Sequence, residues 1–106
     1  MASRRSARRP RPERYVLRLF VTGMSPRSSR AIANARSLCE QHLPGGYDLD
    51  IVDLYQDPAR ARSEQIIAAP TLVRKQPLPL RRLVGDLSDT PRVLRSLGLP
   101  PRPATA

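Results

Sequence analysis

Residues 65–91 read QIIAAPTLVRKQPLPLRRLVGDLSDTP, and this stretch decides which fold the chain can adopt. Two apolar runs, 71–75 and 80–85, are typical of β-strands, and a short segment with Pro77 and Pro79 joins them. Two strand-like runs with a short connection predict a β-hairpin. Prolines in that connection remove backbone donors and fix φ where strand pairing begins, so the local signals of this stretch conflict.

The preceding residues predict a strand–helix–strand unit. Residues 15–23 carry β-branched and aromatic side chains on both faces, which indicates an inner strand. Ser25 is a good N-cap and Pro26 suits the first position of the helix that follows. Residues 47–55 alternate apolar side chains with aspartates, which favours a strand with an exposed face or near a sheet edge. Together these elements predict a right-handed parallel βαβ unit.

The predicted helix has one apolar face. Cys39 lies on that face, which indicates a small core residue rather than a reactive thiol. We expect His42, near the end of the helix, to lie at the surface and to interact favourably with the helix dipole. The apolar face consists of Ala31, Ile32, Ala35, Leu38, Cys39 and Leu43.

Two further helices complete the pattern. A short, weakly apolar helix is predicted from Asp57 to about Ile67. The last helix is expected to begin near Asp89 or Thr90, with Gly98 in the position that ends it. The predicted order is therefore β-α-β-α-β-β-α. A βαβ half followed by a ββα half is the thioredoxin-like layout, and the fold class is α/β.

Composition sets the limits of the domain. The chain has 106 residues and a formal net charge of +10. Residues 1–14 contain six arginines and one glutamate, and residues 99–106 contain three prolines. Neither end has enough apolar surface to offset the entropy lost on ordering. We therefore expect one domain at 15–98 between two disordered tails.

Several functional classes lack their residues in this sequence. No apolar run is long enough to cross a membrane, and the N-terminus lacks the apolar region of a secretory signal, so the cytoplasm is the expected compartment. One cysteine and one histidine cannot build a zinc site, and no glycine-rich phosphate loop is present. The turn 23–27 has no cysteine where a thioredoxin-like enzyme places its thiol. We expect no catalytic residue, cofactor or metal.

Four segments of this sequence resemble the KaiB family of circadian-clock proteins. They are YVLRLFVTGMSP at 15–26, APTL at 69–72, PLPLRRLV at 77–84 and GDLSD at 85–89. The likeness extends from about residue 15 to residue 97. The long basic N-terminus, and the absence of the acidic C-terminal tail of the cyanobacterial proteins, point to a non-cyanobacterial or divergent paralogue.

The resemblance implies a binding protein rather than an enzyme. KaiB proteins are metamorphic: a ground-state fold assembles into dimers or tetramers, and a thioredoxin-like monomer binds the ATPase KaiC. KaiA and a sensor histidine kinase, SasA, are the further partners that the family implies. It also implies a cis peptide bond before Pro70 in the thioredoxin-like state. The residues placed in the switching region are Pro70, Pro77, Pro79, Gly85 and Asp86.

Three residues are candidates for contact with the ATPase. Arg30 and Arg82 match basic positions of the family, and Asp50 lies on the exposed face of its strand; ordinary solvated charge accounts for each equally well. Two other functions remain open. A degenerate thioredoxin-like oxidoreductase would depend on Cys39. Binding of nucleic acid or an anionic surface would depend only on the tail, because the domain has no basic stripe with interleaved aromatics. The tail residues are Arg4, Arg5, Arg8, Arg9, Arg11 and Arg14.

Overall fold

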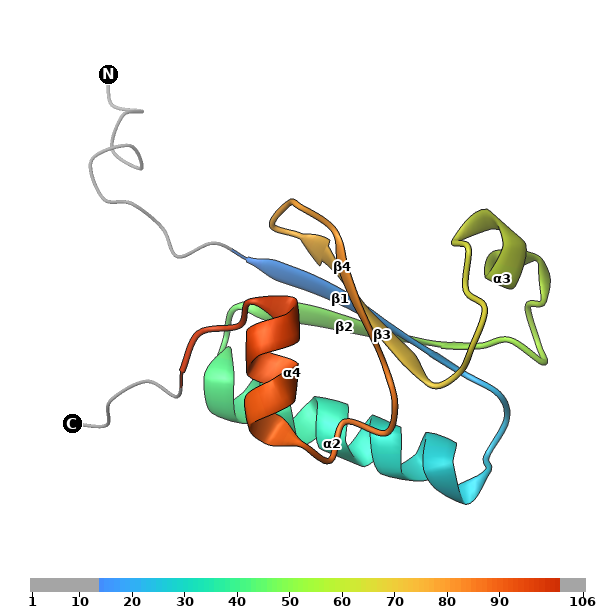
Figure 1. Ribbon diagram of the computed structural model, residues 1–106, viewed down its shortest axis with the longest axis horizontal. Coiled ribbons are helices and arrows are strands. Elements are labelled where there is room, and N and C mark those ends of the chain that lie inside the picture. The colour runs from blue at the N-terminus through green and yellow to red at the C-terminus, as the bar shows by residue number, and fades with distance from the viewer. Residues whose placement is uncertain (1–13, 102–106) are drawn as a thin grey trace.

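A computed structural model describes residues 14–101 of the chain (Figure 1). The order of its elements is β-α-β-α-β-β-α, which confirms the predicted thioredoxin-like layout rather than the alternative KaiB ground-state arrangement. The bounds are β1 Tyr15–Val21, α2 Pro26–His42, β2 Tyr47–Asp53, α3 Ala59–Ser63, β3 Thr71–Gln76, β4 Arg81–Val84 and α4 Thr90–Leu97.

The four strands form one mixed sheet in the order β2-β1-β3-β4. β1 pairs in parallel with β2 and antiparallel with β3, and β3 pairs antiparallel with β4. β1 is therefore an inner strand and β2 an edge strand, as their sequences indicate. The 71–75 and 80–85 runs do pair as a hairpin despite the prolines in their connection.

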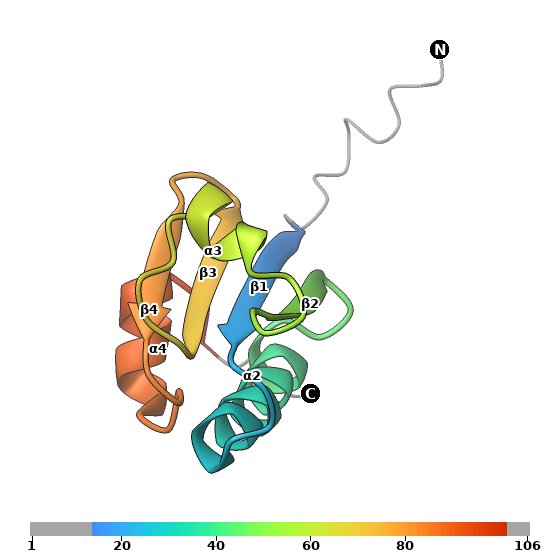
Figure 2. The same cartoon turned by 90° about the vertical axis from the view of Figure 1, so that its right-hand side faces the viewer.

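The main core lies between the sheet and the two longer helices. Figures 1 and 2 show α2 and α4 on the same face of the sheet, with α3 at the end where β3 begins. Phe20, Val52, Ile66 and Val73 form a smaller core on the opposite face. The buried residues of the main core are Leu17, Leu19, Val21, Ala31, Ala35, Leu38, Cys39, Leu43, Leu72, Leu83, Leu87, Val93, Leu97 and Leu99.

The ends of the two longer helices follow the predicted signals. The Ser25 hydroxyl accepts a hydrogen bond from the Ser28 amide at 3.1 Å, which caps α2. Asp89 caps α4 in the same way through the Arg92 amide, at 3.3 Å. Gly98 ends α4 with φ of 63°, a left-handed conformation that glycine adopts at little cost.

The short helix α3 ends earlier than its sequence suggested. It stops at Ser63, and Gln65 has a left-handed φ of 57°. This turn directs Ile66 into the smaller core and leaves Ile67 97% exposed. The prediction of a helix through Ile67 was wrong because the burial of Ile66 against the sheet, rather than helical periodicity, sets the course of this segment.

His42 is buried, which contradicts the predicted surface position. The residue is 7% exposed, and its ring Nδ1 lies 3.0 Å from the carbonyl oxygen of Pro100. The chain beyond α4 covers the last turn of α2, and Leu99 is also buried there. The packed region thus continues past the expected boundary at residue 98. The rest of the two predicted tails, 1–13 and 102–106, lies outside the described residues.

Candidate protein-interaction surface

The turn between β1 and α2 holds a serine where a redox enzyme of this layout would hold a thiol. The Ser25 hydroxyl is occupied as the cap of α2. Cys39 lies farther along the same helix and is 2% exposed. Burial, together with the nearby Glu40 carboxylate, raises the pKa of the Cys39 thiol to about 12. A thiol with this pKa is protonated at neutral pH and is a poor nucleophile.

A row of side chains crosses the sheet on the face opposite α2 and α4. The strand register places Asp50 beside Arg18, Arg18 beside Val73, and Val73 beside Arg82. Two of the three candidate contact residues, Asp50 and Arg82, therefore share a face but lie at its opposite edges. Their separation by two inner strands means that they do not form one compact site.

A network of charges joins α3 to this row. Arg18 Nη1 donates to Glu64 Oε2 at 3.0 Å, and Lys75 Nζ donates to Glu64 Oε1 at 2.8 Å. Arg18 Nε makes an ion contact with Asp50 at 3.3 Å without hydrogen-bond geometry. The hydrogen bond from Lys75 and the charge of Arg18 lower the pKa of Glu64, although burial opposes them. Glu64 is therefore ionised at neutral pH and links α3 to β1 and β3.

Arg82 is tied to the same connection from the other edge. Its Nη1 donates to the main-chain oxygen of Gln65 at 2.8 Å, while the residue stays exposed. The carbonyl belongs to the left-handed residue that ends the α3 segment. Arg82 thus has a structural partner and still presents charge to solvent.

Arg30 and Asp86, predicted separately as a contact residue and a switching residue, lie together. Arg30 Nε donates to Asp86 Oδ2 at 3.2 Å, and Asn34 Nδ2 donates to the Asp86 main-chain oxygen at 2.8 Å. Asp86 Oδ1 accepts from the Ser88 amide at 3.1 Å. Hydrogen bonds from Ser88 and Arg30 lower the pKa of Asp86. These contacts tie the loop before α4 to α2.

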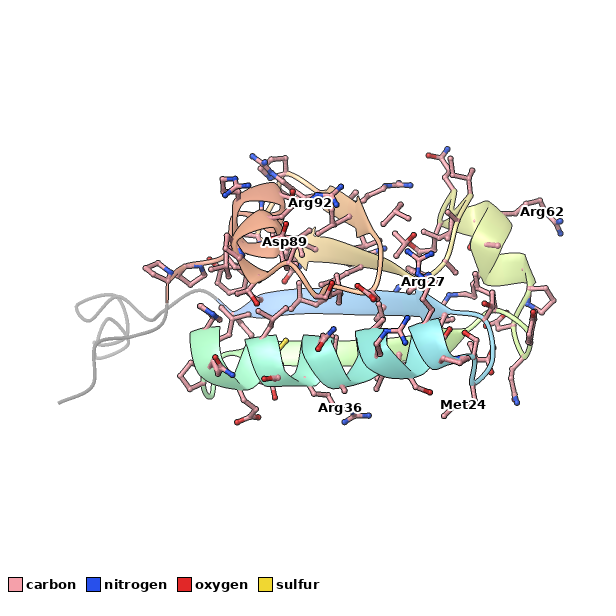
Figure 3. The ribbon with its side chains drawn as sticks, turned by 60° about the horizontal axis from the view of Figure 1, so that its bottom comes forward. Met24, Arg27, Arg36, Arg62, Asp89 and Arg92 are labelled. Carbon is pink, nitrogen blue, oxygen red and sulfur yellow. The ribbon has the colours of Figure 1, made fainter. Side chains whose placement is uncertain are left out.

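The loop that contains Asp86 also borders a small cavity. Its volume is about 170 Å³, and it lies between the first turns of α2 and α4. Figure 3 shows Arg27 pointing from α2 toward this loop, with Asp89 and Arg92 at the start of α4. Both arginines are exposed. Two guanidinium groups face two carboxylates, those of Asp86 and Asp89, so the cavity has no clear preference for an ionic ligand.

The remaining switching residues occupy the two ends of β3. The peptide bonds before Pro70, Pro77 and Pro79 are all cis. Pro70 precedes β3, and its oxygen accepts from the Gly85 amide at 2.9 Å, which brings two of the candidate residues together. Pro77 and Pro79 lie at the opposite end, in the connection to β4.

Arg74 is a structural residue that the sequence did not single out. It is 5% exposed, and Nη1 donates to the Leu97 oxygen at 2.8 Å while Nη2 donates to the Pro79 oxygen at 2.9 Å. Its guanidinium therefore joins the end of α4 to the β3–β4 connection. A Cβ atom at Gly98 would lie 2.8 Å from Arg74 Nη1, so glycine also leaves room for this contact.

The sequence also did not reveal the network of Arg18, Glu64 and Lys75. The only signal in the sequence was Arg18, which interrupts an otherwise apolar face of an inner strand. Its partners come from elements that are distant in sequence, and only the strand register brings them together.

Among residues 14–101, no three His, Cys, Asp or Glu side chains are grouped so that they could hold a metal ion. No helix of that part is long and apolar enough to cross a membrane.

Comparison with known sequences gives a consistent result. The family model described as the KaiB domain matches residues 18–99. The circadian clock protein KaiB3 of Synechocystis sp. is 44% identical over 88 residues, which cover 83% of this chain and 86% of that protein. The circadian clock oscillator protein KaiB of Synechococcus elongatus is 41% identical over 85 residues, with 80% of this chain and 83% of that protein covered.

Comparison with solved structures supports the fold. The N-terminal domain of Synechococcus elongatus SasA superposes with a TM-score of 0.65 at 21% identity, covering 83% of this chain and 87% of that domain. Mitochondrial thioredoxin 3 of Saccharomyces cerevisiae has a TM-score of 0.65 at 13% identity, covering 81% and 78% of the two chains. These likenesses show the thioredoxin-like fold alone. Since the KaiB model and the KaiB relatives match most of its length, the chain belongs to the KaiB family of circadian-clock proteins.

Proposed function

We propose that this protein is a non-enzymatic regulator that binds a KaiC-type ATPase in the cytoplasm. The observation that carries the proposal is the KaiB-domain match across residues 18–99. The buried, protonated thiol of Cys39 supports a binding role, because it is unsuited to the chemistry of a thioredoxin-like oxidoreductase.

Arg30 and Arg82 are the proposed contacts with the ATPase. The side chain of Arg30 is 57% exposed although its Nε holds Asp86, so its terminal nitrogens can still reach an acidic partner. Arg82 uses Nη1 for Gln65 and keeps the rest of its guanidinium group available. Arginine is suited to such contacts because its planar group can bind a carboxylate through two parallel hydrogen bonds.

Asp50 is the proposed contact for a second partner. It lies at the β2 edge, across the sheet from Arg82, so one partner would have to span four strands to reach both residues. KaiA is the candidate for that contact, whereas a sensor histidine kinase would compete with this chain for the ATPase. The likeness of the fold to the SasA domain supports a model in which two proteins of similar shape compete for one site on the ATPase.

We further propose that the thioredoxin-like arrangement is the binding state of a fold-switching protein. The second state would rearrange the segment that holds Pro70, Pro77, Pro79, Gly85 and Asp86, and would self-associate into dimers or tetramers. A ligand can populate one state only through its greater affinity for that state. In NMR spectra of the free chain, two sets of peaks in slow exchange are expected, and saturating ATPase should leave one set. A single set in both conditions would contradict switching.

Binding can be tested by co-elution with the KaiC-type ATPase of the host, with and without ATP. The wild-type chain is expected to co-elute in one nucleotide state, and Arg30→Ala and Arg82→Ala to weaken binding about tenfold or more, as loss of a charged interface contact does. Arg36→Ala is the matched control, because Figure 3 shows Arg36 pointing away from the loop that Arg30 holds. Absence of binding in either nucleotide state would refute the proposal.

A further inference from the structure

The outer side of β2 carries an unusual concentration of acidic residues. Four of the nine acidic residues of the chain lie between positions 48 and 57. A shallow hollow of about 400 Å³ runs along the end of β2 and is lined by three carboxylates but only one guanidinium. β1 is the only strand that pairs with β2 in the sheet of residues 14–101, so the outer edge of β2 has no neighbouring strand. The charged lining residues are Asp50, Asp53, Asp57 and Arg60.

The chain already turns one arginine toward this edge. Arg14 donates from Nε and Nη2 to both carboxylate oxygens of Asp48, at 2.9 and 2.8 Å. Its Nη2 also donates to the Tyr47 oxygen, at 2.9 Å. Arg14 is the last of the six arginines that begin at Arg4. The first described residue of the basic segment is therefore bound at the start of the acidic edge.

The preceding residues are long enough to cover the rest of the edge. β2 has seven residues, so the edge is about 23 Å long at a rise of roughly 3.3 Å per residue. Arg4, the arginine of the segment farthest from Arg14, precedes it by ten residues and could lie up to about 33 Å away when the chain is extended. To pass from the start of β1 over β2 to its outer side, the chain must cover about 10 Å. This is two strand spacings of roughly 4.8 Å each. The segment is therefore just long enough to reach the end of β2, where Asp57 lines the same hollow as Asp50 and Asp53.

Charge favours this edge over the opposite one. Arg81 and Arg82 are exposed on β4, so that edge would repel a basic segment. Exposed ion pairs are individually weak. Because the segment is tethered to the domain, its effective concentration at the edge is about millimolar. Several weak ion pairs together are therefore enough to hold it there.

We propose that the arginine-rich segment 4–11 docks on the acidic outer edge of β2 in the same chain, along Asp50 and Asp57. Pro10 and Pro12 lack the backbone donors that strand pairing needs, so the segment cannot add to the sheet as a continuous fifth strand. Side-chain ion pairs are therefore the basis of the contact. The docked segment covers Asp50. Where Asp50 contacts a second partner, as proposed above, the segment competes with that partner; this consequence rests on the proposed function, but the contact itself does not.

Paramagnetic relaxation enhancement on the free, full-length chain tests the contact without any ATPase. A nitroxide is attached at Ser6→Cys in a Cys39→Ala background, which removes the native thiol. At about 20 mM salt we expect the amide signals of residues 48–57 to broaden more strongly than those of residues 81–84, which lie across the sheet. At about 0.5 M salt the broadening should disappear, because screening shortens the range of the charges. Broadening spread evenly over the domain, or unchanged by salt, would overturn the proposal.

Two sets of variants separate charge from other causes. Changing Arg4, Arg5, Arg8, Arg9 and Arg11 together to lysine should keep the broadening, whereas changing them to glutamine should abolish it. Asp50→Asn with Asp57→Asn should abolish it from the other side, and unchanged signals elsewhere will show that the domain is folded. Retention of the broadening in the glutamine variant would refute the proposal. So would broadening that appears only when isotope-labelled and spin-labelled copies are mixed, since it would place the segment on another molecule.

Discussion

The two halves of the domain are held together by different kinds of contact. The first half, β1 to β2, packs a continuous apolar helix face against an inner strand, with Ser28 and His42 as its buried polar residues. The second half, α3 to α4, also contributes to the core, but polar groups from distant segments fix its elements: Arg82 on Gln65, Lys75 on Glu64 and Arg74 on Leu97. Apolar burial is non-directional, whereas a hydrogen bond exists only in one arrangement. The second half therefore owes its particular arrangement to polar contacts.

The largest effect is expected where the apolar half is broken. Leu19 lies on β1, is fully buried, and belongs to the main core. Leu19→Ala should reduce the free energy of unfolding by about 2–5 kcal/mol, since it removes apolar contacts and leaves a cavity. Urea unfolding followed by circular dichroism measures this change. Leu78→Ala, at a residue 78% exposed, should change it by less than about 0.5 kcal/mol. Equal losses in the two variants would show that the core does not lie where the structure places it.

A smaller and more local effect is expected from Arg74 in the second half. Arg74→Met keeps the apolar stem but removes the donors to Leu97, Gly98 and Pro79. We expect a loss of about 1–3 kcal/mol, because hydrogen bonds from a charged group are strong and the carbonyls are left unpaired. Amide hydrogen exchange should accelerate in α4 more than in β1.

Arg95→Met is the matched control for Arg74, because Arg95 is on α4 but exposed. It should leave exchange in α4 unchanged. A uniform acceleration across the domain in Arg74→Met would mean that the second half is not held separately. Increased stability would mean that the cost of burying this charge exceeds the value of its hydrogen bonds.

The same contrast explains which features the sequence could predict. The Ser25 cap, the start of α4 near Asp89 and the Gly98 stop depend on neighbours within a few residues, and each was predicted. The end of α3 at Ser63 and the burial of His42 depend on chain segments that arrive from elsewhere. No local pattern contains that information.

The candidate contact surface was predictable only as separate residues. Resemblance to the KaiB family pointed to Arg30, Arg82 and Asp86, and the exposed face of its strand pointed to Asp50. Neither signal gave the positions of these residues relative to one another. The register of four strands places Asp50 and Arg82 in one row, and the loop before α4 brings Asp86 to Arg30. Such pairings are tertiary, so composition and periodicity carry no trace of them.

The charged link between α3 and the sheet predicts a pH dependence. Lys75 and Arg18 lower the pKa of Glu64 in the folded chain below its usual value of 4.5. Glu64 therefore contributes stability above pH 4.5, and this contribution is lost as the pH falls through its folded pKa. Glu64→Gln should lower stability at pH 7 by about 0.5–1 kcal/mol, the range of partly exposed pairs. The two proteins should converge in acid.

Thermal unfolding of wild type and Glu64→Gln between pH 7 and 3 measures this difference. Asp48 and Asp86 also have lowered pKa values but are present in both proteins, so the difference between the curves isolates Glu64. Parallel curves over the whole range would show that the ion pairs with Lys75 and Arg18 do not hold α3 in solution.

The smallest expected effect concerns the backbone of the second half. Gln65 is an exposed residue with φ of 57°. In this left-handed conformation the Cβ atom of a side chain clashes with the backbone at a cost of roughly 1–2 kcal/mol, which is absent for glycine. Glycine also gives the unfolded chain more freedom, which lowers the free energy of unfolding by roughly 0.5–1 kcal/mol. In urea unfolding of Gln65→Gly we therefore expect a net gain in the free energy of unfolding between zero and about 1 kcal/mol. Gln65→Ala keeps the side-chain cost and should give no gain. The bond from Arg82 reaches the main-chain oxygen of residue 65 and survives in both variants. A loss of stability in Gln65→Gly would therefore mean that the Gln65 side chain itself stabilises the fold, and that polar contacts hold the second half still more extensively than the structure indicates.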